Sequence, residues 1–234
     1  MKLANLIALV AAFTSVGCHS EVKSQPKFIF TLGTPLSEIK KDANFKTCKF
    51  KDNKIHDTQK AEGILNFERY MCKGSERVEH LELSFYNQTL VIIGAFFIQP
   101  SPEESAILLI NNEKGTSETL AYKEKYLDLH AALVEKCKEI GSSQGEKSLG
   151  EGTKQSSGVF IANFSNMFTD NKQYTCNILT EKRERWYEDE KVKYVWIYPY
   201  AIVISNVPVV QEAIKKDNEF KESEEAKSRK KFNF

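Results

Sequence analysis

Cysteine thiols offer the most predictable chemistry in this sequence. The chain has five cysteines, and Cys48, Cys72, Cys137 and Cys176 lie beyond its first thirty residues. Four cysteines in an exported chain indicate disulfides, with three connectivities. We expect Cys48–Cys72 and Cys137–Cys176, because each pair then stays within one half of the chain; four buried free thiols are the alternative. No pair has C-x-x-C spacing, so neither a zinc site nor a thioredoxin-like motif is indicated.

The histidines show no spacing typical of a metal site. They are His19, His56, His80 and His130. The stretch EHLE, residues 79–82, places Glu and His on opposite faces of a strand, which argues against joint ligation. His130 lies on the apolar stripe of an expected helix, so we interpret it as a core or boundary residue. No metal or cofactor is expected.

Catalytic motifs are also missing from the sequence. No Gly-x-Ser-x-Gly elbow occurs, and GEKSLGEGTK, residues 145–154, lacks the G-x-x-x-x-G-K-[ST] pattern of a phosphate-binding loop. We therefore assign no catalytic residue and expect a protein that is not an enzyme. An envelope hydrolase with an unrecognised active site is the competing hypothesis.

An aromatic cluster is the best candidate for a functional surface. It lies in RWYEDEKVKYVWIYPY, residues 185–200. Its members are Trp186, Tyr194, Trp196 and Tyr198. Large amphipathic side chains with charged neighbours suit a protein interface. They also suit a core edge with polar atoms at the rim, and we favour that interpretation.

Residues 1–17 have the layout of a secretory signal peptide. Lys2 gives a positive start, an apolar run follows to Phe13, and small residues end the segment. The run is shorter than the ~20 residues that a membrane span needs. It contains one charge, so its removal leaves equal numbers of basic and acidic side chains. That balance argues against a nucleic-acid partner.

The stretch Ser15-Val16-Gly17-Cys18 resembles the lipobox of bacterial lipoproteins. The resemblance implies cleavage before Cys18 and acylation of its thiol. Residues 18–27 then form a polar tether. We expect the protein in the cell envelope, facing the periplasm and anchored to the membrane by the lipid. Ordinary signal peptidase also accepts Ser15 and Gly17, so a soluble periplasmic or secreted protein is the alternative.

The hydrophobic pattern predicts an α+β domain over residues 28–207. We expect a helix after Thr34-Pro35, then strands near 45–51, 64–72, 77–85 and 90–98, with a turn at Asn87-Gln88. A second helix should start at Ser101, and a third lies within 117–140 and ends at Gly141. The predicted architecture is an antiparallel sheet with helices packed on one face.

Later segments complete this expected domain. Residues 142–158 are rich in Gly and Ser and indicate a mobile loop. Strands are expected at 159–164, 173–180, 184–187, 192–198 and 201–206. Residues 208–234 form a mixed-charge tail, partly helical or disordered. Tyr-x-Cys at 70–72 and at 174–176 hints at two tandem helix-plus-sheet repeats, residues 28–112 and 113–207.

Two further stretches resemble known exported families. LGTPLSEIKK, residues 32–41, looks like the opening helix of small lipoproteins of outer-membrane protein assembly. Tandem disulfide-bonded units of this kind resemble β-lactamase-inhibitor proteins, and YLDLHAALVEKCKEIG, residues 126–141, is similar to a helix of such exported proteins. The resemblance implies a binding or scaffolding protein without a catalytic centre. We therefore expect a lipoprotein that binds an envelope protein, with its oligomeric state left open.

Overall fold

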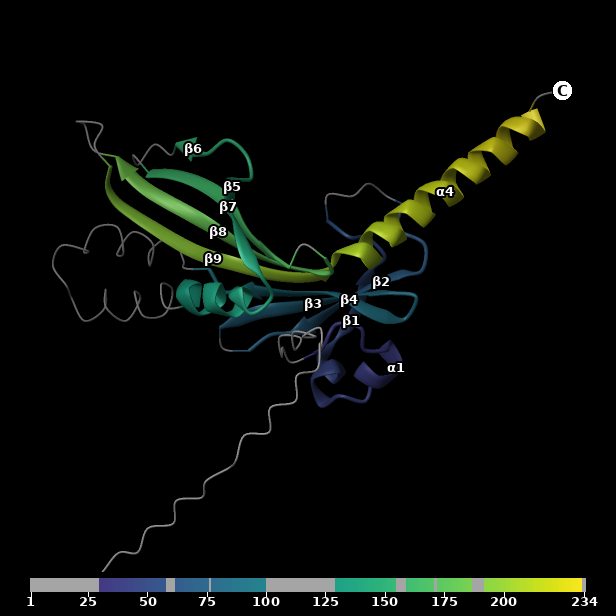
Figure 1. The fold of residues 1–234 in the computed structure, drawn as a ribbon, viewed down its shortest axis with the longest axis horizontal. Coiled ribbons are helices and arrows are strands. Elements are labelled where there is room, and N and C mark those ends of the chain that lie inside the picture. The colour runs from purple at the N-terminus through teal and green to yellow at the C-terminus, as the bar shows by residue number, and fades with distance from the viewer. Residues whose placement is uncertain are drawn as a thin grey trace, which may run out of the picture.

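The chain folds around one large antiparallel sheet (Figure 1). The computed structural model describes residues 30–57, 62–75, 77–99, 129–154, 159–170, 172–186 and 192–232. The sheet has nine strands in the order β1-β2-β3-β4-β9-β8-β7-β5, and β6 also pairs with β7. The strands β1 to β4 lie side by side in chain order, and so do β7 to β9. These two groups meet where β4 pairs with β9.

The first half begins with two short helical segments. They are α1 (Leu36–Ile39) and the 3-10 helix η1 (Ala43–Thr47). Four strands follow: β1 (Lys49–Asp52), β2 (Phe67–Lys73), β3 (Val78–Tyr86) and β4 (Thr89–Phe97). Asn87 and Gln88 have positive φ of 47° and 62°. Such values at both central positions are typical of the hairpin turn predicted here.

The second half begins with a helix over residues 129–138. Its strands are β5 (Ser142–Ser148), β6 (Thr153–Lys154), β7 (Val159–Thr169), β8 (Tyr174–Trp186) and β9 (Val192–Asn206). The helix α4 (Val207–Phe232) follows β9 directly. The Asn206 side chain accepts the Val209 N–H at 3.4 Å, a weak N-cap contact. Figure 1 shows α4 projecting away from the sheet.

The main core lies between the sheet and the helical segments before β1 and β5. Leu36 and Ile39 of α1 and Leu133 of the 129–138 helix are buried there. They pack with side chains from β2, β3, β4, β7, β8 and β9, among them Phe85 and Ile204. This helix-covered face therefore runs across both halves of the sheet.

A smaller core lies where α4 starts. Ala213 is buried with Ile64, Phe67, Tyr86 and Val91. The first turns of α4 thus cover one end of the sheet beside β2 and β3. The rest of the helix extends beyond this contact (Figure 1).

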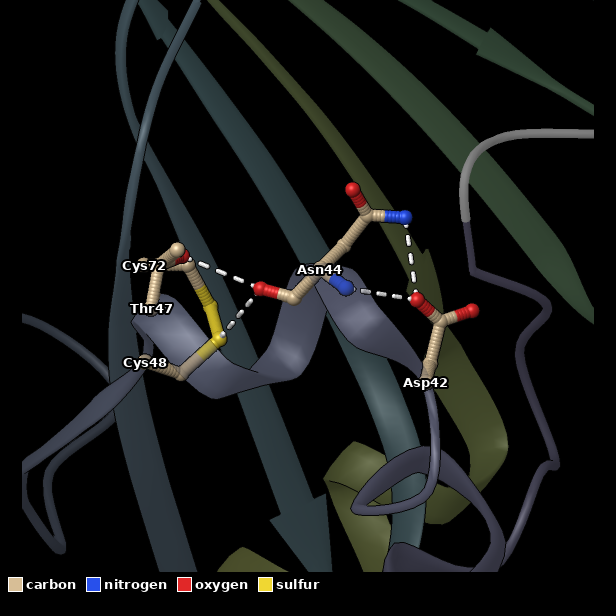
Figure 2. Close-up of a disulfide and its surroundings, with 5 residues drawn as sticks. All are labelled: Asp42, Asn44, Thr47, Cys48 and Cys72. Atoms are coloured by element: carbon tan, nitrogen blue, oxygen red, sulfur yellow. Dashed lines mark hydrogen bonds between the residues drawn. A yellow bond between two sulfur atoms is a disulfide. The ribbon is translucent and has the colours of Figure 1, made fainter.

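The disulfide Cys48–Cys72 joins the end of η1 to β2 (Figure 2). The Asp42 carboxylate accepts the Asn44 N–H at 2.8 Å and so caps η1. Thr47 donates its hydroxyl to the Asn44 carbonyl at 3.0 Å. These local bonds fix the turn that brings Cys48 to its partner.

The structure corrects the predicted fold class. The described chain is largely β, an antiparallel sheet of nine strands with few helical segments on it, and not the expected α+β domain. Residues 142–158, predicted as a loop, contain β5 and β6. The pairs of strands expected at 173–187 and 192–206 are each one continuous strand, β8 and β9. β5 and β6 pair with β7 through backbone bonds, which need no apolar pattern. β9 continues through Pro199 by pairing with β8, at a register shift between Leu179 and Thr180.

Several element boundaries also differ from those expected. Pro35, not Thr34, is the N-cap of α1, and no side chain caps it. Residues 43–47 form η1 where the start of a strand was expected. The tail expected to be partly helical or disordered is one helix, α4, which reaches Phe232. The helix expected from Ser101 lies outside the described residues.

The two Tyr-x-Cys segments do not lie on equivalent strands. Tyr70 and Cys72 lie on β2, two places from the β4–β9 junction. Tyr174 and Cys176 lie on β8, which is next to that junction. The short sequence match therefore does not relate the two runs of strands.

Candidate partner-binding surface

The face opposite α1 and the 129–138 helix is the candidate site. We call it the open face and define it by two cross-strand rows. Strand register sets the first row: Met71, Glu82, Gly94, Val203, Asn177 and Met167. The second row is Lys73, His80, Phe96, Ala201, Leu179, Ser165 and Lys147.

Side chains in these rows are mixed in character and mostly partly exposed. Met71, Val203, Leu179 and Met167 are neither buried nor fully exposed. They project from paired strands, which hold them in a fixed arrangement. Among the described residues, the start of α4 is the helical segment that packs on this side of the sheet.

A stacked pair of aromatic rings lies near the centre of the open face. The rings of His80 and Phe96 stack with centroids 4.5 Å apart and planes 10° from parallel. A Cβ at the buried Gly94 would lie 3.2 Å from the Phe96 ring, so the ring lies close over the glycine backbone. Gly94 thus provides the space that lets Phe96 lie against the sheet.

A buried cation organises the edge of the open face. The Arg69 side chain is only 3% exposed and pairs with Asp52, Asp57 and Glu82. Its contact with Asp52 is bidentate, at 2.9 Å from Nε and 2.7 Å from Nη2. Lys51 donates to Glu82 at 2.6 Å. The network joins β1, β2, β3 and the segment after β1, so its first effect is structural.

The network also shifts the pKa values of its members. Hydrogen bonding to Arg69 is the largest effect on Asp52 and lowers the pKa of that carboxyl. Burial opposes the charge of Asp57, but bonds to Lys51 and Arg69 outweigh it and lower its pKa. Burial likewise opposes the charge of Lys51, while bonds to Glu82 and Asp57 raise its pKa. These groups stay charged over a wider pH range, as a structural ion-pair network requires.

A groove lies between α4 and the segment before β2. It has a volume of about 750 Å³. Asp217 of α4 accepts the Leu65 N–H at 3.0 Å and pairs with Lys221 at 2.8 Å. Leu65 and Phe220, which both line the groove, are 46% and 48% exposed. A buried contact therefore joins the two walls of the groove, and both walls carry partly exposed apolar side chains.

The expected disulfide pairing is confirmed. Cys48 pairs with Cys72, and Cys137 pairs with Cys176. Cys137 and Cys176 are fully buried, and they join the 129–138 helix to β8. Disulfides are typical of exported proteins. Cys18 lies outside the described residues, so its acylation stays a prediction.

The predicted aromatic cluster is only partly described. Tyr198 is 1% exposed, and the Arg183 guanidinium lies 5.1 Å from its ring centroid. Its burial agrees with the core-edge interpretation and removes it from an exposed surface. For Trp186, Tyr194 and Trp196 the structure describes the backbone alone, within β8 and β9. Their role in a partner surface stays a prediction.

The histidines differ in part from expectation. His80 and Glu82 share a face, with His80 Nε2 3.8 Å from the carboxylate, so the interpretation of EHLE was wrong for this pair. His130 is half-buried, and burial lowers its pKa, as suits a boundary residue. Within the described ranges, no group of three or more His, Cys, Asp or Glu residues has a metal-binding arrangement.

Sequence reasoning missed the Arg69 network and the His80–Phe96 stack. The one available signal was Arg69 between Phe67 and Met71, because alternation in a strand places all three side chains on one face and so puts a cation among apolar neighbours. His80 and Phe96 become neighbours only through the register of β3 with β4. That register is not readable from either segment alone.

The described helices include none with the length and apolar character of a membrane span. Comparison with known proteins gives no assignment: no protein-family model, no curated protein and no solved structure matches this chain.

Proposed function

We propose that this chain is a non-enzymatic cell-envelope lipoprotein that binds another protein through the open face of its sheet. Cys18 carries the lipid in this proposal and residues 18–27 provide the tether. The export-type disulfides and the lipobox resemblance support the location. The resemblance to exported binding proteins supports the class of function.

The row of partly exposed side chains across the open face carries the proposal. Met71, Val203 and Met167 lie in one register row, and Phe96 and Leu179 lie in the next. Methionine and aromatic side chains are enriched in protein interfaces. A paired sheet holds their backbone rigidly, so little backbone freedom is lost when a partner binds.

Partner capture tests the proposal. The protein is cross-linked in intact envelopes and recovered, and the species recovered with it are identified by mass spectrometry. We expect one reproducible partner whose yield falls at least about tenfold in Leu179→Lys and Met167→Lys, because a charge in the centre of an interface removes more than 1.4 kcal/mol of affinity.

Leu149→Lys is the matched control. Leu149 is 53% exposed and lies between β5 and β6, away from the central rows. Its variant should capture the partner as well as the unchanged protein does. Equal recovery from all four proteins would contradict binding through the open face, and thermal unfolding must show that each variant folds.

Anchoring has its own test. Cys18→Ala should block acylation and move the protein out of the detergent phase in a phase-partition experiment, because at least one acyl chain is lost. Unchanged partitioning of the variant would contradict the proposed anchor, while leaving the binding proposal to be decided by capture.

A further inference from the structure

The strand β9 has a long edge without a described neighbour. β4 pairs with β9 only from Ala201 to Ser205, whereas β8 pairs with it from Val192 to Asn206. From residue 194 to residue 199 the pairing with β8 has no register shift. This half of β9 is therefore a regular strand whose side toward β4 has no strand partner among the described residues.

The Gln99 side chain shows which backbone groups point to this edge. Gln99 follows the end of β4 at Phe97, and its Nε2 donates to the Pro199 carbonyl at 3.4 Å. The N–H and C=O of one residue point to the same side of an antiparallel strand, and alternate residues point the same way. Val195 and Ile197 therefore direct both groups toward the edge and away from β8. Pro199 fits this assignment, because a position that faces away from β8 needs no N–H for the ladder.

The outer edges of the sheet are less suited to pairing with another strand. β1 has four residues and a register shift between Phe50 and Asp52. β5 has a register shift between Ser143 and Glu146, with Gly145 at a φ of 86°. Short strands and bulges protect an exposed edge from pairing. The regular run of β9 has neither of these features.

The sequence of this run is nearly the same in both directions. Residues 194–198 are Tyr-Val-Trp-Ile-Tyr, with Trp196 at the centre. When two copies are aligned antiparallel about Trp196, Val195 of one copy lies opposite Ile197 of the other. Lys193 then lies opposite Pro199, so no like charges face each other. β-Branched residues in opposite positions form a favourable cross-strand pair.

We infer that a second copy of this chain adds to the free edge of β9, with a two-fold axis at Trp196. The two sheets then continue into one antiparallel sheet. Each Val195–Ile197 pair across the axis exchanges both of its backbone hydrogen bonds. Both copies use the same edge, so the contact closes as a dimer. The dimer uses an edge of the sheet and does not require the open face to bind a partner.

Sedimentation of the full-length protein in non-ionic detergent measures this association. Micelles are in large excess, so that two lipidated chains do not share one by chance, and we expect a concentration-dependent dimer. Ile197→Pro removes an N–H that faces away from β8, so the monomer should fold while the dimer dissociation constant rises at least about tenfold. Ile197→Val keeps this N–H and should change the constant less than about threefold.

Cysteine cross-linking tests the register of the dimer. The two Trp196 positions face each other across the axis, at a Cα separation that a disulfide can span. Trp196→Cys should therefore form a disulfide between copies on mild oxidation. Tyr194→Cys is the matched control. Its position faces residue 198 of the second copy, about 13 Å along the strand from the other residue 194, so it should not cross-link.

Amide hydrogen exchange provides a measurement that needs no variant. We expect the amides of Val195 and Ile197 to exchange quickly in the monomer and to become protected as the dimer forms. Protection of both amides in a monomer would overturn the inference, because another segment of the same chain then occupies the edge.

The remaining outcomes are equally decisive. A monomer at all concentrations, a dimer that Ile197→Pro leaves intact, or equal cross-linking from positions 194 and 196 would overturn the inference. Loss of the dimer in Ile197→Pro, with unchanged capture of a partner through Met167, supports the inference and separates it from the proposed function.

Discussion

The carboxylate of Asp217 accepts the backbone N–H of Leu65 at 3.0 Å across 152 residues of sequence. The Asp217 side chain is 7% exposed and also pairs with Lys221. The contact joins α4 to the segment before β2. Together with the buried Ala213, it holds the start of the projecting helix to the rest of the fold.

Removal of this contact should loosen α4. Asp217→Ala leaves the Leu65 N–H without its acceptor, and we expect the free energy of unfolding to fall by about 1–3 kcal/mol. Asp217→Asn should lose less, because its amide oxygen can still accept the bond. Urea denaturation measures both; equal losses in the two variants would contradict the role of the hydrogen bond. Glu219→Ala, at an exposed site on the same helix, should change stability by less than about 0.5 kcal/mol.

Arg69 should be the most sensitive charged residue in the described structure. Arg69→Met removes one cation from among Asp52, Asp57 and Glu82, and leaves the half-buried Glu82 with one fewer partner. Breaking a buried ion pair on one side typically costs about 3–5 kcal/mol, and we expect a loss in that range by chemical denaturation. Lys51→Met, at a more exposed site, should cost clearly less. A loss under about 1 kcal/mol for Arg69→Met would show that the network contributes little.

The same network predicts a dependence on acid. The pKa values of Asp52 and Asp57 are lowered in the folded protein, so both groups stabilise it above their unfolded pKa of about 4. That stability is lost as pH falls through the lower folded values. The difference in unfolding free energy between the unchanged protein and Arg69→Met should therefore shrink below about pH 4. A difference that is constant across this range would contradict the assignment.

Gly141 should tolerate no side chain. A Cβ at this position would lie 2.0 Å from the Thr169 carbonyl oxygen, which belongs to the backbone of β7 and cannot rotate away. We expect Gly141→Ala to lower stability by about 1–3 kcal/mol through this overlap. Ser142→Ala, next in sequence and exposed, is the control and should be nearly neutral. Thermal unfolding compares them, and equal melting temperatures would refute the overlap.

The two disulfides should differ in access to reductant. Cys137 and Cys176 are fully buried, whereas Cys48 is partly exposed. Under native conditions we expect a small thiol to reduce Cys48–Cys72 first, because attack requires access to a sulfur atom. Alkylation followed by mass spectrometry gives the order. Reduction of Cys137–Cys176 first would mean that the second half opens more readily than its burial indicates.

The β3–β4 hairpin was predictable from sequence alone. Leu81, Leu83 and Phe85 alternate with polar residues, and Asn87-Gln88 supplies residues that accept positive φ. The cysteine pairing was predictable for a different reason: each disulfide closes a short loop within one half of the chain. In both cases the signal is local.

The edge strand β5 was not predictable in this way. Every residue of β5, Ser142–Ser148, is exposed, so no apolar alternation marks the strand. Its pairing with β7 comes from backbone bonds that any sequence can make. The Arg69 network was hidden because its partners lie 17 residues before it and 13 residues after it, on separate segments. The open face likewise emerges only from the register of strands in both halves.

Site-specific photo-cross-linking shows whether a partner contacts the open face. A photoreactive residue is placed at Met167, at Leu179, or at Lys138 on the exposed side of the 129–138 helix, and each protein is irradiated in intact envelopes. We expect the same cross-linked partner from Met167 and Leu179, and none from Lys138. Cross-links from Lys138 alone, or no cross-links from the two sheet positions despite good expression, would contradict a binding function for the open face.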